Sequence, residues 1–330
     1  MTAADRPPTT RADLQRAILG QEPDLTSEQV AQRAGITVED ARRLWRALGF
    51  PDPGDEAVFG RADADALSSI EEAVEQDGLD LDTVVRMTRA VGQTIARLAD
   101  WEVAILTREV ERLASEPGRL DEARRMVDTI GPGFEALLVY AWRRHLAAAV
   151  SRIELLGDHD DDDQHVAEAT VGFADLVSFT ALTNELDEDQ IGDLVEIFES
   201  RCHDVVADRA GRVVKTLGDS VLFLADMAEE GIDIALDIVA VIGGDARLPD
   251  VRLGLATGPV VLRQGDVYGP SVNLAARLTT VARRNRVIID EHTAELLPAA
   301  EFETRRLPAR SVRGFGEMEP ITVRRTRPRH

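Results

Sequence analysis

Residues 172–180 read GFADLVSFT, and residues 215–220 read KTLGDS. Each stretch places one aspartate where an apolar segment gives way to a turn, Asp175 in the first and Asp219 in the second. An aspartate at either position is ordinary by itself. Two of them brought together on one sheet would repel each other unless a cation lay between them. The pair therefore admits two interpretations, as separate turn residues or as a magnesium–phosphate site.

The sequence around these aspartates predicts alternating strands and helices. Residues 171–176 have the composition of a buried strand, after which Ser178 can begin a helix. Residues 213–217 and 221–224 predict two strands joined by a tight turn at Gly218 and Asp219. The whole region, 166–330, predicts an α+β, ferredoxin-like (split βαβ) domain. Its other expected elements are helices near 187–207, 228–242, 271–282 and 291–297, a strand pair at 251–263, and strands at 286–289 and near 304 and 321.

Composition narrows the classes of function. The 330 residues are 44% apolar and carry a net charge of −22, with a pI near 4.7. Because like charges repel, this negative charge argues against nucleic acid and anionic membranes as partners. A single cysteine, Cys202, excludes a disulfide within the chain or a cysteine zinc site, and a buried structural thiol is expected. We find no signal peptide and no apolar run long enough to span a membrane, so we expect a cytoplasmic protein.

Residues 1–156 predict an all-helical regulatory domain without a convincing strand. Residues 27–34 and 38–48 form two short helical patterns separated by Gly35, the outline of a helix-turn-helix. One alternative is therefore a sensor or regulator that binds DNA. The second helix begins with Glu39 and Asp40, which would meet phosphates, so a structural helical pair is the preferred interpretation. Longer helical patterns cover 81–113 and 120–156, the latter with an expected interruption at Gly131-Pro-Gly133.

Residues 157–165 form a linker between the two halves that contains five aspartates and two histidines. A charged linker is the preferred interpretation, with a cation site as the alternative. Nearby carboxylates favour the charged imidazole, so His159 and His165 are candidates for a response to pH.

A third motif, residues 266–277, reads DVYGPSVNLAAR. Asp266 precedes a predicted helix, on which Asn273 and Arg277 are four residues apart and share one face. An asparagine and an arginine facing a cleft suit a site where charge develops on a phosphoryl group.

Together these three motifs closely resemble the class III nucleotidyl cyclases, over about residues 165–325. The chain is most similar to bacterial homodimeric adenylyl cyclases with a helical regulatory domain, including the pH-responsive actinobacterial type. The resemblance implies two Mg²⁺ or Mn²⁺ ions per active site. Their expected ligands are the carboxylates of Asp175 and Asp219 and the backbone carbonyl of Leu176.

The resemblance also implies how the substrate, ATP, is bound. Lys215 and Asp266 correspond to the family's adenine-reading pair, and Asn273 and Arg277 to its transition-state pair. Arg313 corresponds to a basic residue on the triphosphate, although many relatives have lysine there and arginine differs in geometry.

The implied reaction is attack of the ribose 3′-hydroxyl on the α-phosphorus, which yields 3′,5′-cyclic AMP and pyrophosphate. The family assembles each site from two chains, so a homodimer with sites at its interface is expected. Relatives with this layout are restrained by the helical half, and some respond to protons or to a lipid. The alternative activity is that of a guanylyl or broad-specificity cyclase.

Overall fold

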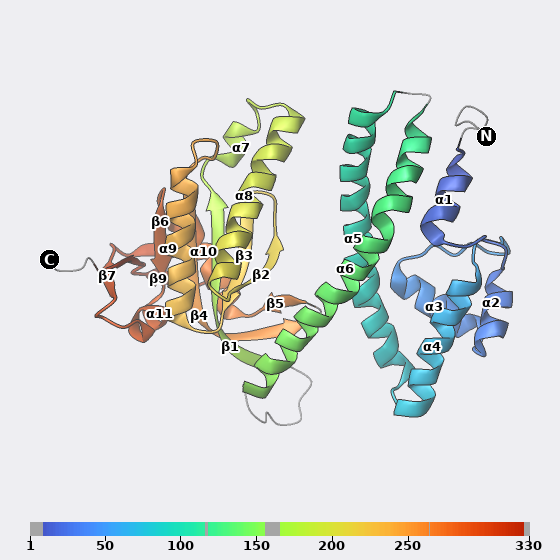
Figure 1. The fold of residues 1–330 in the computed structure, drawn as a ribbon. Coiled ribbons are helices and arrows are strands. Elements are labelled where there is room, and N and C mark those ends of the chain that lie inside the picture. The colour runs from blue at the N-terminus through green and yellow to red at the C-terminus, as the bar shows by residue number, and fades with distance from the viewer. Residues whose placement is uncertain (1–8, 116–117, 156–165, 264, 327–330) are drawn as a thin grey trace. The chain divides into compact units, whose positions relative to one another are not determined.

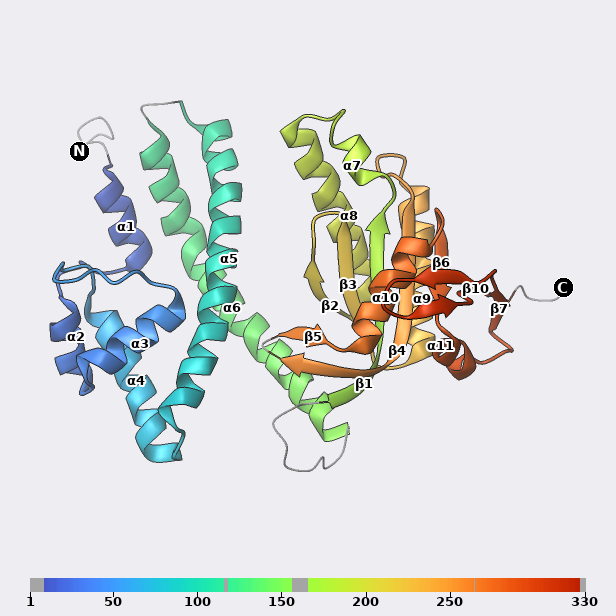
Figure 2. The same ribbon diagram turned by 180° about the vertical axis from the view of Figure 1, so that it is seen from behind.

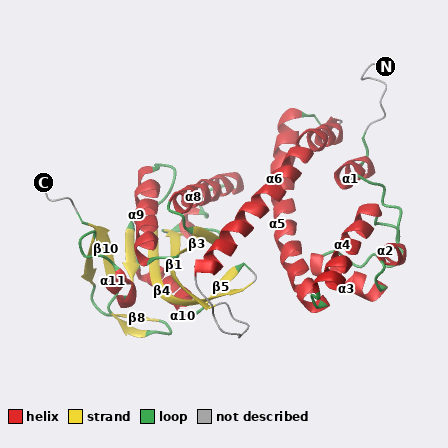
Figure 3. Ribbon diagram, turned by 60° about the horizontal axis from the view of Figure 1, so that its bottom comes forward, coloured by secondary structure: helices red, strands yellow, loops and turns green. Residues whose placement is uncertain are grey.

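The structure, a computed structural model, describes residues 9–115, 118–155, 166–263 and 265–326. The chain divides into two compact units, Met1–Gly157 and Asp158–His330. The first is helical in its described part, and the second combines a sheet with helices (Figures 1 and 3). The acidic linker, with His159 and His165, lies outside the described residues.

The helical unit contains six described helices, and cap residues fix where several of them begin. Thr26 and Thr37 accept hydrogen bonds from backbone N–H groups in the first turns of the second and third helices. Gly35 ends the second helix in the left-handed conformation, with a φ of 79°. The helices are α1 (Arg11–Leu19), α2 (Ser27–Ala34), α3 (Val38–Leu48), α4 (Arg61–Asp77), α5 (Leu81–Leu113) and α6 (Arg119–Leu155).

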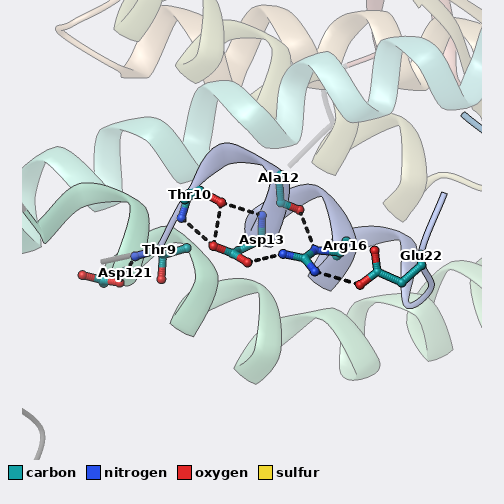
Figure 4. Close-up of polar contacts among 7 residues, drawn as sticks. All are labelled: Thr9, Thr10, Ala12, Asp13, Arg16, Glu22 and Asp121. Atoms are coloured by element: carbon teal, nitrogen blue, oxygen red, sulfur yellow. Dashed lines mark hydrogen bonds and ion pairs between the residues drawn. The ribbon is translucent and has the colours of Figure 1, made fainter. Parts of the chain in front are cut away.

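Helix α1 is anchored by polar contacts at its start (Figure 4). The Thr10 side chain and the Asp13 carboxylate cap each other's backbone N–H groups. Arg16 forms ion pairs with Asp13 and with Glu22, the latter at 2.7 Å. The Thr9 N–H donates to Asp121 on α6 at 3.0 Å, which joins α1 to that helix.

The apolar core of this unit lies between α2, α3, α4 and the beginning of α5. It is formed by residues between Leu25 and Val85. Trp45 stacks on Phe59 with ring centroids 4.1 Å apart. None of its members comes from α6.

The expected break at Gly131-Pro-Gly133 is wrong, because α6 continues through Pro132. Proline removes one hydrogen bond, to the carbonyl of Asp128, but its fixed φ suits a helix. The segments on both sides are rich in strong helix formers such as alanine, leucine and arginine, so they continue the helix across it.

The second unit is built on a sheet in which β1 and β4 are central. The strands are β1 (Val166–Leu176), β2 (Arg212–Thr216), β3 (Ser220–Ala225), β4 (Val251–Arg263), β5 (Asp266–Tyr268), β6 (Arg286–Ile289), β7 (Phe302–Arg306), β8 (Arg310–Val312), β9 (Gly316–Met318) and β10 (Ile321–Arg325). The main sheet has the order β2-β3-β1-β4-β6-β10-β7, with β5 paired to β4, and β8 and β9 form a separate hairpin.

Helices cover both faces of this sheet. They are α7 (Phe179–Leu182), α8 (Glu188–Asp208), α9 (Ala228–Gly244), α10 (Pro270–Val281) and α11 (Glu291–Leu296). Helices α8 and α9 lie on one face (Figure 1) and α10 on the other (Figure 2). Apolar side chains fill both interfaces, including Phe198 and Ile238 on one side and Ala275 on the other. The order β1-α8-β2-β3-α9-β4, with antiparallel pairing, is the predicted split βαβ arrangement.

The structure differs from the prediction in two details. The expected strand pair at 251–263 is one continuous strand, β4, because it pairs with β1 from Val251 to Val261 without interruption. No strand was expected at residues 266–268, just before the predicted helix, but they form the short strand β5, which pairs back on the end of β4.

Candidate active site

The end of β1 and the β2–β3 hairpin bring the two motif aspartates together. Asp175 pairs with Ser220 in the β1–β3 register, and the Leu176 N–H donates to the Asp219 carbonyl at 2.9 Å. The hairpin turn needs a left-handed residue, which Gly218 supplies with a φ of 69°. The strand end and the turn are therefore fixed to each other by backbone hydrogen bonds.

Asp175 is buried and has two side-chain partners. The Ser220 hydroxyl donates to Oδ1 at 2.6 Å, and the Arg252 guanidinium donates to Oδ2 at 2.6 Å. Arg252 lies opposite Asp175 in the β1–β4 register. The sequence analysis missed Arg252, although an arginine in the otherwise apolar segment 251–256 was a usable signal.

The electrostatics of the pair suit a cation. Burial and then the nearby Asp175 carboxylate raise the pKa of Asp219, because both disfavour a second negative charge. A divalent cation between the two carboxylates would relieve this repulsion, and carboxylate oxygens are the ligands that Mg²⁺ prefers. Within the described part of the chain, no group of three or more His, Cys, Asp or Glu side chains forms a metal cluster. Any further ligands would be backbone carbonyls, such as that of Leu176, substrate oxygens or water.

The predicted base-reading residues are in direct contact. The Lys215 ammonium group lies 2.5 Å from Asp266 Oδ2, and both side chains are partly buried. Although burial opposes ionisation, the hydrogen bond and charge of Lys215 lower the pKa of Asp266. A small cavity of about 190 Å³ adjoins Asp266, between β2 and the β4–β5 connection. The pair therefore offers a charged donor and a charged acceptor side by side.

Asn273 and Arg277 lie on the exposed side of α10. The opposite side of this helix carries the buried residues Ser271, Ala275 and Leu278. Among the described contacts of the chain, none links Asn273 or Arg277 to Asp175 or Asp219. The structure therefore leaves both side chains exposed and does not bring them to the aspartate pair.

Arg313 lies in the turn between β8 and β9, outside the main sheet, and is exposed. No described contact joins it to the other predicted site residues. Its predicted place on the triphosphate stays a prediction.

Cys202 and three arginines of α3 also have defined structural environments. Cys202 is fully buried in α8, and burial raises the pKa of its thiol to about 12. This agrees with the expected structural thiol.

The three arginines of α3, Arg42, Arg43 and Arg46, all form ion pairs with carboxylates. The shortest of these pairs, between Arg43 and Asp82, has an N–O distance of 2.6 Å. These pairs further disfavour phosphate binding by the helix-turn-helix segment.

None of the helices in the described part of the chain combines the length and apolarity that a membrane crossing requires.

Comparison with known proteins identifies the domain family of each half of the chain. Residues 162–324 match the adenylate and guanylate cyclase catalytic domain, and residues 7–145 match the adenylate cyclase regulatory domain. An adenylate cyclase of Streptomyces coelicolor is 39% identical over 94% of this chain and 89% of that one. An adenylate cyclase of Glutamicibacter nicotianae is 35% identical over 95% of this chain and 82% of that one.

A pH-sensitive adenylate cyclase of Mycobacterium tuberculosis is 28% identical over 91% of this chain and 78% of that one. Among solved structures, the adenylyl cyclase CyaB from P. aeruginosa is 20% identical with a TM-score of 0.45, covering 51% of this chain and 98% of that one. The chain belongs to the class III nucleotidyl cyclases, and within them to the adenylate cyclases whose catalytic domain follows a helical regulatory domain.

Proposed function

We propose that this enzyme converts ATP to 3′,5′-cyclic AMP and pyrophosphate. The observation that carries the choice of ATP is the Lys215–Asp266 ion pair, with 2.5 Å between Nζ and Oδ2. A cation can donate to adenine N1, and a carboxylate can accept from the adenine amino group. Guanine presents the opposite pattern at these positions. The curated relatives named adenylate cyclases, at 35–40% identity, support the same choice.

Asp175, Asp219 and the carbonyl of Leu176 would hold two Mg²⁺ or Mn²⁺ ions. When bound, these ions lower the pKa of the ribose 3′-hydroxyl and neutralise charge on the phosphates. The chain's own contribution is to fix the two carboxylates, through Ser220 and the hairpin, so that they need not reorganise during the reaction.

Four side chains are assigned to the nucleotide beyond its base. Asn273 positions the ribose, and Arg277 offsets the charge that develops on the α-phosphoryl group. Arg252, whose guanidinium already lies beside Asp175, is well placed to contact the polyphosphate, and Arg313 is the further candidate.

We propose further that the enzyme is a homodimer with sites at its interface. Within one chain, Asn273 and Arg277 lie on an exposed helix side and have no described contact with the metal-binding pair. A second chain can present them to Asp175 and Asp219. Two chains then make two equivalent sites.

The helical half is proposed to regulate this activity, with protons or a lipid as candidate signals. The pH-sensitive relative from Mycobacterium tuberculosis supports a response to pH. His159 and His165, in the linker, and His145, on α6, are the histidines to replace first. The pH proposal fails if cyclase activity at saturating Mg-ATP is the same in mildly acidic and mildly alkaline buffer.

The test of the activity is formation of cyclic AMP from ATP with Mg²⁺ or Mn²⁺, compared with formation of cyclic GMP from GTP. We expect turnover of ATP to exceed that of GTP by at least tenfold. Equal turnover would favour a broad-specificity cyclase. If a folded protein produced neither product, a non-catalytic sensor would become the better interpretation, to be tested by a salt-dependent DNA-binding assay.

A further inference from the structure

Both carboxylate oxygens of Asp175 are engaged by side chains of its own chain. Nε and Nη2 of Arg252 each lie 2.6 Å from Oδ2, and the Ser220 hydroxyl donates to Oδ1 at 2.6 Å. An ionised carboxylate offers about two lone pairs on each oxygen. Arg252 therefore engages both lone pairs of Oδ2, and one position remains on Oδ1.

The strand register explains why these two side chains meet. Arg252 and Asp175 are direct partners between β4 and β1, so their side chains project from the same face of the sheet. Their chain neighbours Leu176, Val251 and Leu253 are buried in the core on the face covered by α8 and α9. The Asp175 side chain is 13% exposed and that of Arg252 is 32% exposed. Part of the arginine side chain therefore faces solvent, and the guanidinium can turn away from Asp175 without crossing the core.

A divalent cation on Oδ2 would compete with Arg252 for that oxygen. Mg²⁺ lies about 2.0–2.1 Å from its oxygen ligands, so it would come within about 5 Å of the nearest guanidinium nitrogen, where like charges repel. It would also need a lone pair that Arg252 already engages. The Ser220 hydroxyl is neutral and contacts the other oxygen, so it opposes the cation in neither way. Arg252 alone opposes it both by charge and by occupancy.

The polyphosphate of a nucleotide removes this opposition. A guanidinium binds phosphate oxygens through the same paired N–H donors with which it binds a carboxylate. When Arg252 turns from Oδ2 to a phosphate, one ion pair replaces another and Oδ2 becomes available to the cation. We propose that Arg252 makes cation binding at Asp175 depend on the polyphosphate, because it opposes the cation alone and admits the cation together with the nucleotide. By linkage, the cation then favours the nucleotide to the same extent.

This coupling deepens the proposed function and rests on its metal-binding pair, but not on the choice of ATP over GTP. Its test measures binding by the full chain and not turnover. Calorimetry gives two dissociation constants, that of Mn²⁺ alone and that of the Mn²⁺ complex of α,β-methylene-ATP. In this analogue a methylene group replaces the bridging oxygen whose bond to the α-phosphorus breaks in the proposed reaction.

The test variant is Arg252→Gln, which removes the charge and keeps a polar side chain. We expect it to bind Mn²⁺ alone at least about fivefold more tightly than the wild type, and the Mn²⁺–analogue complex at least about tenfold more weakly. Arg252→Lys keeps the charge, so it should bind Mn²⁺ alone within about threefold of the wild type. Arg247→Gln is the matched control, because it breaks an exposed ion pair with Asp245 and should change neither constant by more than about twofold.

The opposite signs of the two effects identify the coupling. If Arg252 only positioned or stabilised Asp175, both constants would rise in Arg252→Gln, and this result would overturn the proposal. Arg252→Lys that bound Mn²⁺ as tightly as Arg252→Gln would also overturn it, since charge would not be the cause. Absence of Mn²⁺ binding in the wild type and all variants, with and without the analogue, would remove the metal-binding pair itself and the coupling with it.

Far-UV circular dichroism and thermal melting check that each variant is folded. The Arg252 side chain is about one third exposed, so a neutral side chain of similar length should be accommodated. Arg252→Met supplies a second neutral variant with the same two expected results.

Discussion

Lys215 and Asp266 are 51 residues apart in sequence, and the lysine Nζ lies 2.5 Å from the Asp266 Oδ2. The contact joins β2, near one edge of the sheet, to β5, which pairs with the far end of β4. A charged pair in this place holds a donor and an acceptor at a fixed separation before any nucleotide binds. Such preorganisation favours discrimination between bases, because little order is lost on binding.

Asp266→Asn should reduce the preference for ATP. The amide keeps the shape but loses the charge, and its NH₂ group cannot accept from the adenine amino group. We expect kcat/KM for ATP to fall about 10- to 100-fold, which corresponds to about 1.4–2.8 kcal/mol, while that for GTP falls less. Asp233→Asn breaks an ion pair with Arg325 on another part of the sheet and should leave the ATP to GTP ratio unchanged. An equal fall for both nucleotides would show that Asp266 does not read the base.

Asp219→Asn should remove metal binding as well as activity. The substitution halves the carboxylate charge at the pair and leaves an amide where a divalent cation requires an anionic oxygen. We expect cyclase activity to fall at least about 1,000-fold and Mn²⁺ affinity, measured by calorimetry with a non-hydrolysable ATP analogue, to fall at least about tenfold. Asp189→Asn, an exposed position in the first turn of α8, is the control and should retain both. Intact Mn²⁺ binding in Asp219→Asn would remove this residue from the metal site.

Mixing two inactive variants should restore activity if each site draws on both chains. Asp219→Asn lacks a metal ligand, and Arg277→Ala lacks the transition-state residue. A mixed dimer would carry both defects in one site and neither in the other. With random exchange, half of the dimers are mixed and each has one intact site of two, so about a quarter of wild-type activity is expected. Activity that remains at the level of the separate variants after verified subunit exchange would contradict shared sites.

The sequence predicts the parts of the site that depend on local pattern. Asp175 lies at the end of a strand, Asp219 lies in a hairpin turn, and Asn273 and Arg277 share a helix side. These local settings follow from the sequence pattern around each residue. Arg252 stands out in its apolar segment, but its contact with Asp175 follows from the β1–β4 register, which joins residues 77 positions apart and cannot be read from either segment alone. The continuity of α6 through Pro132 was missed for a different reason, because a proline can either end or kink a helix and only the flanking turns decide.

Cys202 should make stability depend on alkaline pH. Burial raises the pKa of its thiol from 9.0 to about 12, so at pH 10 the unfolded chain releases this proton and the folded chain keeps it. The folded state binds more protons, and its stability therefore falls as pH rises from about 9 toward 12. At pH 10 the contribution is about 1.4 kcal/mol relative to pH 8. Urea denaturation at both pH values should show this extra loss in the wild type and not in Cys202→Ala.

Asn285 should support the end of β1 that carries Asp175. Its side chain accepts from the Val251 N–H at 3.2 Å and donates to Asp250 at 2.6 Å, and the Asp250 carbonyl accepts from the Val177 N–H at 2.8 Å. Asn285 also has a φ of 51°, a left-handed conformation that asparagine tolerates better than most residues.

Two substitutions at Asn285 separate these effects. Asn285→Ala loses the hydrogen bonds and adds backbone strain, so the free energy of unfolding should fall by about 2–4 kcal/mol. Asn285→Gly loses only the hydrogen bonds, because glycine adopts this φ freely, and should cost about 1–2 kcal/mol less than alanine. Chemical denaturation measures both values, and equal losses would mean that backbone conformation contributes nothing here. If kcat also falls in either variant at a temperature where the protein remains folded, the hydrogen bonds from Asn285 through Asp250 to Val177 help to position Asp175.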